Sequence, residues 1–414
     1  MATSTFVIAE DVVRLTPEKP ARFYAPELDA LRFFAFMLVF ARHVSSGIGF
    51  AKKSVDAQHA KILAAGPAIS HHVSFSSYLK VQEIAQSLDF GVCLFFFLSS
   101  FLITRLLLIE RETTGRIRTS RFYLRRCLRI WPLYFFFLAV VISLSGFFPV
   151  LHVSSPRLLA AMLFVGNWAA VFHGWDSMAI QPLWSVSVEE QFYIIWPAFA
   201  RHGRTAIIAA SSVLVMISIA TLIYFGNRPG TEITATWPNT FVQGLFLAGG
   251  ALTACFPFPE TRWLRTRLRV TFLALGGLCW LVASAVCHIV RTQSPGPVSL
   301  VTGYGLVLVG TMLIFNGVAG WSGRPIPKVF LYLGKISFGL YVFHVACLLL
   351  MEQATAMLQA RWLIGSASPY LAAGISSVLA LLLTVVCASL TYHFLERPFL
   401  RLKDRFSAIH TRPV

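Results

Sequence analysis

Two ionisable residues in the first long apolar run of the chain are candidates for chemistry, and one of them, His43, could carry out proton transfer. Arg32 and His43 lie in the segment ALRFFAFMLVFARH, eleven residues apart, so an α-helix places them on one face about 16 Å apart along its axis. A charged side chain near the centre of a bilayer costs about 2.5 to 3.5 kcal/mol, which makes such residues functional candidates. A histidine, with an ordinary pKa of about 6.5, suits general base catalysis. The alternative is that Arg32 reaches lipid headgroups and that His43 is an interfacial histidine.

A pair of adjacent carboxylates marks a second candidate site. Glu189 and Glu190 stand in PLWSVSVEEQFYIIWP, residues 182–197, where Trp184 precedes them in an apolar context. A carboxylate in the first turn of a helix is stabilised by the helix dipole, which accounts for one of the two. The other could orient a histidine or accept the proton of a hydroxyl group.

A polar stripe is expected on a later apolar segment. Ser337, Tyr341 and His344 recur with the spacing i, i+4 and i+7, which lines one face of a helix. Such a stripe either faces a water-filled cavity or forms a hydrogen-bonded seam with a neighbouring helix.

Arginines are aligned in the basic segment 110–130. Arg118, Arg121, Arg125 and Arg129 fall within an arc of about 80° if this segment is helical. Clustered arginines at a membrane surface set topology and touch anionic lipid. Alignment is not needed for topology, however, and arginine is preferred where phosphates are bound by paired hydrogen bonds. The segment is therefore a candidate site for a phosphorylated ligand.

The composition places these residues on membrane helices. The 414 residues are 56% hydrophobic and 13% charged, whereas soluble domains carry about 25% charged residues. This excludes a soluble enzyme, a disordered chain and a disulfide scaffold. The formal net charge is +17, which in a membrane protein indicates basic cytoplasmic loops and sites for anionic ligands rather than nucleic acid.

The apolar runs predict an all-α bundle of about ten transmembrane helices plus a re-entrant segment. Counting 157–173 as a full crossing would place the basic loop 258–269 on the outside, so we interpret 157–173 as re-entrant and 50–87 as an external loop. Both termini are then cytoplasmic. The predicted crossings are 30–49, 88–109, 131–151, 183–200, 205–225, 239–257, 270–290, 298–320, 330–350 and 371–395.

Several common chemistries have no support in the sequence. The seven cysteines contain no CxxC pair, and His71 and His72 have no cysteine or carboxylate partner at ligand spacing, so no metal is expected. No Walker loop, GxGxxG, HExxH or GxSxG motif is present. Two non-enzymatic hypotheses stay open. The chain could be a transporter or flippase of a lipid-linked or small polar substrate, or it could be a membrane sensor or scaffold.

The ordered motifs resemble acyltransferase family 3, a family of integral membrane acyltransferases. Two departures from its pattern are Ser100 in place of the usual glycine and Arg42 before His43. The resemblance spans roughly residues 24 to 400 and rests on six elements: LDALR with His43, GVCLFFFLSSFLIT (91–104), FYLRRCLRIWPLY (122–134), WSVSVEEQFYIIWP (184–197), LGKISFGLYVFH (333–344) and ERP (396–398).

The resemblance implies transfer of an acyl group, usually acetyl, from cytoplasmic acyl-CoA to a hydroxyl of a cell-envelope or exported carbohydrate, or of a small molecule. Acyl-CoA is a co-substrate, and no cofactor is bound permanently. The expected location is the bacterial inner membrane. Some members of the family carry a fused external domain, and the expectation for this chain is action alone or with an unfused external partner. The acceptor, the acyl chain length and the oligomeric state are left open.

The resemblance and the residues together assign roles. His43 is expected to act as general base or as a transient acyl carrier, with Glu189 orienting its ring and Arg32 holding the donor. The expected acyl-CoA contacts are Arg121, Arg125, Arg126 and Arg129; the expected acceptor or secondary residues are His344, Tyr341, Ser337, Trp184 and Glu190. The expected domains are a cytoplasmic segment (1–27), the membrane acyltransferase domain (28–400) and a basic cytoplasmic tail (401–414).

Overall fold

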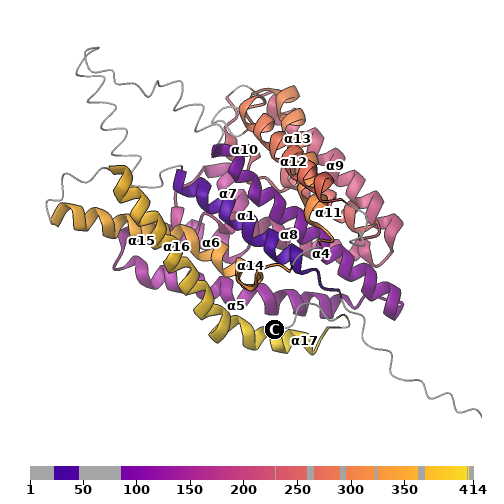
Figure 1. The fold of residues 1–414 in the computed structure, drawn as a ribbon, viewed down its shortest axis with the longest axis horizontal. Coiled ribbons are helices and arrows are strands. Elements are labelled where there is room, and N and C mark those ends of the chain that lie inside the picture. Colours follow the sequence, from indigo (N-terminus) through magenta and orange to yellow (C-terminus); the bar gives the residue numbers. More distant parts are fainter. Residues whose placement is uncertain are drawn as a thin grey trace, which may run out of the picture.

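The computed structural model describes residues 23–45, 85–228, 230–258, 265–289, 295–321, 325–361, 369–407 and 409. These residues form helices joined by turns, without a β-strand, so the predicted all-α fold is confirmed (Figure 1). Most of the predicted external loop 50–87, including His71 and His72, lies outside the described residues.

Helices follow one another along the whole described chain. Their bounds are α1 (Pro26–Ser45), η1 (Ser87–Phe90), α4 (Gly91–Thr114), α5 (Thr119–Ser145), η2 (Pro149–Leu151), α6 (Ser155–Met162), α7 (Gly166–His173), η3 (Met178–Ile180), α8 (Leu183–Ala200), α9 (Arg204–Gly226), α10 (Ile233–Thr236), α11 (Thr240–Ala254), α12 (Thr266–Ala285), α13 (Pro297–Val318), α14 (Lys328–Lys335), α15 (Ser337–Arg361), α16 (Pro369–Thr391), the π-helical turn η4 (Tyr392–Glu396) and α17 (Arg397–Asp404).

Seven helices of the described part are long and apolar enough to cross a membrane. They are Ser87–Thr114, Thr119–Ser145, Arg204–Gly226, Thr266–Ala285, Pro297–Val318, Ser337–Leu358 and Leu371–Asp404. The other three predicted crossings are α1 and α8, which carry several charged or polar residues, and α11, which has 15 residues. The number of ten crossings therefore stays a prediction.

The ambiguous segment 157–173 does not form one crossing helix. It is divided between α6 and α7, which have eight residues each and at about 1.5 Å per residue cannot span a bilayer. Asn167 on α7 donates to Thr240 Oγ1 at 2.9 Å and accepts from Gln191 Nε2 at 2.9 Å. Because α7, α8 and α11 satisfy one another's amides in this way, the polar residues that interrupt the apolar run hold the short helices in place.

The arginine-rich segment is helical over most of its length. Gly115 ends α4 in the left-handed conformation (φ 71°), and α5 begins at Thr119. Arginine is a good helix former, so the charged residues extend α5 ahead of its apolar part. Arg121, Arg125 and Arg129 stand in α5, whereas Arg118 precedes the helix with a non-helical backbone, so the condition for a common face is met by three of the four arginines.

One predicted crossing differs from the structure, and one predicted domain limit falls inside a helix. The predicted crossing 330–350 consists of α14 and the start of α15, which are separated at Ile336. The predicted end of the membrane domain at residue 400 lies within α17, which packs against α5.

Two groups of helices enclose a central layer (Figure 1). Helices α9, α11, α12 and α13 pack together as the first group. The second group holds two packed pairs, α15 with α16 and α5 with α17. Helices α1, α4 and α8 lie between the two groups. Close approach of α4 and α11 depends on Gly250, because a Cβ there would overlap the Phe97 carbonyl oxygen and Ser100 Oγ. The unusual Ser100 is fully buried and is accommodated by this glycine.

Candidate active site

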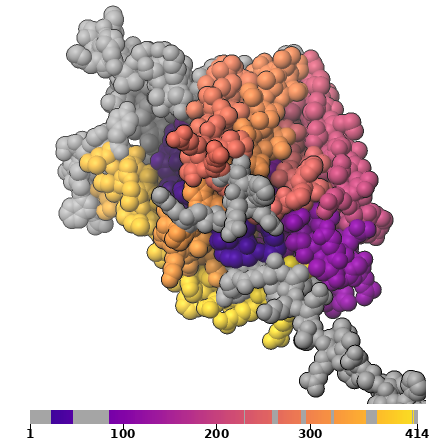
Figure 2. All heavy atoms as spheres, turned by 45° about the vertical axis from the view of Figure 1, so that its right-hand side comes forward, coloured from indigo at the N-terminus to yellow at the C-terminus, as the bar shows by residue number. Residues whose placement is uncertain are grey.

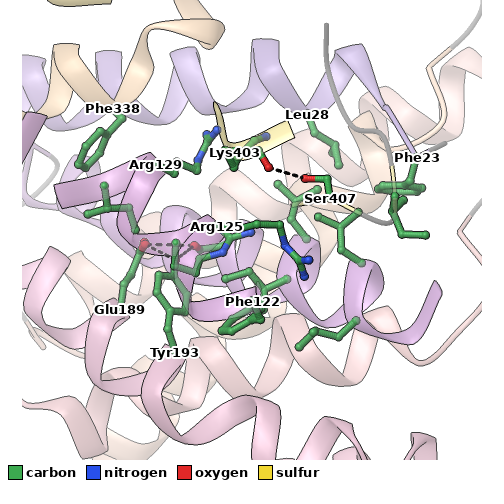
Figure 3. Close-up of a pocket in the computed structure, with 18 of the residues that line it drawn as sticks. Phe23, Leu28, Phe122, Arg125, Arg129, Glu189, Tyr193, Phe338, Lys403 and Ser407 are labelled. Carbon is green, nitrogen blue, oxygen red and sulfur yellow. Dashed lines mark hydrogen bonds between the residues drawn. The ribbon is translucent and has the colours of Figure 1, made fainter. Parts of the chain in front are cut away.

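A cavity of about 160 Å³ lies at the end of the bundle where α1 begins and α4 ends, which we call the basic end. On the face drawn in Figure 2, the start of α1 reaches the surface between α4 and the C-terminal helices. The polar residues that line the cavity are Tyr24, Asp29, Arg32, Ser99, Glu110, Arg125, Arg126, Arg129, Glu189, Tyr193, Lys403 and Ser407. Figure 3 labels several of them, among them Arg125, Arg129 and Lys403.

Cations outnumber carboxylates in this cavity. Arg125 is partly committed, since it pairs with Glu110 at 2.7 Å and donates to the Phe406 carbonyl oxygen at 3.0 Å. Arg126 lies with its guanidinium 5.6 Å from the ring centroid of Phe122 and 5.7 Å from that of Tyr193. Its buried Nε has no hydrogen-bond partner among the described residues, which leaves a donor for a ligand.

The four arginines expected to bind acyl-CoA do not all reach the cavity. Arg125, Arg126 and Arg129 line it, whereas Arg121 is exposed and lies outside it. Lys403 on α17 takes a place that the predicted set did not include.

Glu189 is part of a buried hydrogen-bonded group at the inner end of the cavity. Its Oε2 accepts from Tyr193 Oη at 2.5 Å and from Ser99 Oγ at 3.1 Å, and Ser99 and Tyr193 also bond to each other. Figure 3 shows these contacts. The Arg32 guanidinium is close enough to interact electrostatically with this carboxylate. Glu189 thus balances the cations of the cavity.

The hydrogen bonds of Glu189 go to Ser99 and Tyr193, and its role in orienting the His43 ring stays a prediction. The explanation of one carboxylate by the helix dipole is wrong, since α8 begins at Leu183 and has no acidic residue in its first turn.

His43 forms a pair with His344 from α15. The two rings are 4.9 Å apart between centroids, and His43 Nδ1 lies 3.4 Å from His344 Nε2. His43 Nδ1 also lies 2.9 Å from the Val39 carbonyl oxygen, and His344 Nδ1 lies 2.5 Å from that of Tyr341.

These distances assign the protons. A carbonyl oxygen only accepts, so each Nδ1 carries a hydrogen. His344 Nε2 then accepts from His43 Nδ1–H, and His43 Nε2 holds the lone pair that a general base requires.

An ion pair lies beside this histidine. Arg42 Nε donates to Asp89 Oδ2 at 2.9 Å, which links the end of α1 to η1, the short helix that precedes α4. Asp89, whose charge acts on the His43 imidazole, was not among the predicted site residues. It could have been noticed as a lone carboxylate at the start of an apolar run.

On α1, α4 and α15, aromatic residues stand in the chain between a residue that lines the cavity and the region of the histidine pair. Tyr341 accepts from Ser185 Oγ at 2.8 Å and packs edge-on against Phe95 at 5.6 Å, while Phe36 packs edge-on against His344 at 5.8 Å. The polar stripe on α15 is therefore a hydrogen-bonded seam, not the wall of the cavity. His43 is not among the residues that line the cavity.

The remaining candidates lie outside the cavity. Trp184 is buried against Phe96 and Trp237, and Ser337 is buried at the start of α15. Glu190 Oε2 accepts from Trp131 Nε1 at 3.4 Å, about 100° around α8 from Glu189. Tyr193, which follows Glu189 by one helical turn, was missed although its i+4 spacing placed it on the same face.

Comparison with known proteins gives consistent matches. A family model described as an acyltransferase domain matches residues 26–393. Peptidoglycan O-acetyltransferase OatA of Listeria monocytogenes is 26% identical over 366 residues, which cover 82% of this chain and 54% of that protein. Putative peptidoglycan O-acetyltransferase YrhL of Bacillus subtilis is 26% identical over 333 residues, covering 74% and 50%. The chain spans about half the length of these relatives. No solved structure matches significantly.

Proposed function

This chain belongs to acyltransferase family 3, and we propose that it transfers an acetyl group from cytoplasmic acetyl-CoA to a hydroxyl of a cell-envelope or exported carbohydrate. Two of the relatives are named as peptidoglycan O-acetyltransferases, which supports a carbohydrate acceptor of this kind. The observation that carries the proposal is the cation-lined cavity that leads from the basic end of the bundle into the protein. The apolar helices and the family support a multi-pass membrane protein.

The acyl end of the donor is proposed to enter the cavity first, so that the phosphates of CoA stay nearest the basic end. Arg126, Arg129 and Lys403 offer charged donors for the diphosphate of CoA, since guanidinium groups bind phosphate oxygens through paired hydrogen bonds. The acyl-pantetheine arm then passes Arg32 and the Glu189 group. Arg32 would stabilise negative charge that develops near the thioester.

His43 is proposed as the general base. Its Nε2 takes the proton of the acceptor hydroxyl while the hydroxyl oxygen attacks the thioester carbonyl carbon. The carbon–sulfur bond breaks, and the CoA thiolate leaves and takes up a proton. An acyl-imidazole on the same Nε2 is the covalent alternative, in which the ring attacks first and the acceptor hydroxyl displaces it.

Acyl transfer at His43 requires a passage between the cavity and the histidine pair. The rings of Phe95 and Tyr341 lie between them, so their side chains would have to move when the donor is bound. Asp89 would stabilise the protonated imidazole that forms during transfer.

The test is turnover by purified protein in nanodiscs with ¹⁴C-acetyl-CoA, with and without soluble peptidoglycan fragments. We expect CoA release in the wild type and its loss, by about 10²- to 10⁴-fold, in His43→Ala. His393→Ala is the matched control, because His393 is an exposed helical histidine whose Nδ1 has the same contact with the carbonyl four residues earlier. Wild-type turnover by His43→Ala would refute the role of His43, and absence of any acetyl-CoA binding would refute the donor.

A further inference from the structure

A second basic pocket adjoins the cavity. It has a volume of about 240 Å³ and is lined by Glu110, Thr114, Arg116, Arg118, Arg121 and Arg125, and we call it the arginine pocket. Glu110 and Arg125 line both spaces, so the ion pair between them forms the shared wall. A ligand too large for the cavity could therefore extend into the pocket.

The charge of the arginine pocket is not balanced by its single carboxylate. Glu110 is buried, with Oε2 bound by Arg125 at 2.7 Å and Oε1 accepting the backbone N–H of Arg118 at 3.2 Å. The side chains of Arg116, Arg118 and Arg121 make no ion pair or hydrogen bond with any described residue. Three guanidinium groups are thus available to an anion.

The backbone adds to this positive potential. Arg118 precedes the first turn of α5, a helix of 27 residues, and no side chain caps that turn. The amino end of a helix carries a partial positive charge and unpaired N–H groups. Since Arg118 and Arg121 line the pocket, the start of α5 lies at its wall.

The chemistry of the pocket fits a phosphate monoester. Arginine forks match phosphate oxygens, and a monoester carries close to two negative charges at neutral pH. CoA has one such group, the 3′-phosphate of its nucleotide, in addition to the diphosphate that joins the nucleotide to pantetheine. With the pantetheine arm and diphosphate in the cavity, the nucleotide must lie at its mouth, next to the arginine pocket.

We infer that the arginine pocket binds the 3′-phosphate of the CoA nucleotide through Arg116, Arg118 and Arg121. This inference rests on the proposed function, because it takes acyl-CoA as the donor. An anionic lipid headgroup offers the same phosphate chemistry, and the experiment must separate the two sources.

The experiment compares acetyl-CoA with acetyl-3′-dephospho-CoA as donors for the protein in phosphatidylcholine nanodiscs. We expect the wild type to show a KM about 10- to 100-fold higher for the dephospho donor, with similar kcat, because charged hydrogen bonds of this kind are lost. In the double variant Arg118→Gln/Arg121→Gln the two KM values should become equal. The control Arg111→Gln/Arg201→Gln removes two exposed charges outside both pockets and should keep the wild-type ratio.

Equal KM values in the wild type, or a ratio that survives in Arg118→Gln/Arg121→Gln, would overturn the inference. A parallel arm measures binding of adenosine 3′,5′-bisphosphate against 5′-AMP. Tighter binding of the bisphosphate by the wild type alone supports the pocket even if turnover of acetyl-CoA is not seen, whereas equal binding overturns it. A third outcome would assign the pocket to a lipid headgroup instead. In that case phosphatidylglycerol would stabilise the wild type but not the double variant, and the two donors would have equal KM values.

Discussion

Replacement of His344 by alanine tests whether His344 assists His43 in its proposed role as general base. His344 Nε2 is 3.4 Å from His43 Nδ1, and the Val39 carbonyl oxygen is 2.9 Å from the same atom. The variant removes one of two acceptors for a single proton. A hydrogen bond contributes about 0.5 to 1.5 kcal/mol, and 1.36 kcal/mol corresponds to a tenfold change in rate, so kcat should fall by about 2- to 13-fold.

This loss is small compared with removal of the base itself. His43→Ala is expected to lower the rate by about 10²- to 10⁴-fold. Because His344 acts through His43, the double variant His43→Ala/His344→Ala should be no slower than His43→Ala. His344→Gln keeps an acceptor oxygen and should recover part of the lost rate.

The assay is initial CoA release in nanodiscs at saturating acetyl-CoA, with thermal unfolding of each variant to confirm the fold. A purely structural role for His344 would lower the unfolding temperature and leave kcat per folded protein unchanged. The assignment is refuted if His344→Ala loses as much activity as His43→Ala, or if the two losses add in the double variant. His344 would then act on a substrate directly.

Three further changes have defined outcomes. Glu189→Gln keeps the bonds to Ser99 and Tyr193 but removes the charge that balances Arg32, so it should raise the KM for acetyl-CoA or lower kcat without loss of thermal stability; unchanged kinetics would contradict this. Arg269→Ala removes a buried guanidinium that donates to three carbonyl oxygens at the end of α13. Thermal unfolding should show that this variant is destabilised by about 3 to 5 kcal/mol. Arg267 is exposed, so Arg267→Ala should not destabilise the protein. Gly250→Ala should reduce the yield of folded protein in size-exclusion chromatography, because its Cβ meets a backbone carbonyl.

The architecture could be predicted from the sequence because the length of each apolar run and the positions of the charged residues can be counted directly. The bounds of α8, residues 183–200, were predicted without error, since Pro182 precedes the helix and the polar link Arg201–Arg204 follows it. Asn167 indicated that 157–173 is not one crossing helix, because its amide needs hydrogen-bond partners in an apolar environment.

The site could be predicted only in part, because contacts between distant segments have no periodic signal. Arg32 and His43 share a helix, so their placement on one face could be predicted from their spacing in the sequence. The partner of His43 could not be inferred, since Asp89 and His344 come from helices at sequence separations that no local pattern reports. Lys403 was missed for the same reason: the return of α17 to α5 depends on tertiary packing.

Helix α1 connects the two halves of the proposed reaction. Arg32 lines the cavity that would receive the donor, and His43 lies beyond the rings that pack between α1, α4 and α15. Phe36 and Phe40 on the intervening turns of α1 pack against His344, so a donor that reaches His43 must disturb the same rings that hold the histidine pair. In the proposed reaction, binding of acyl-CoA and positioning of the base would therefore be coupled through one helix. Such coupling would keep the base shielded until the thioester arrives, which limits hydrolysis of the donor by water.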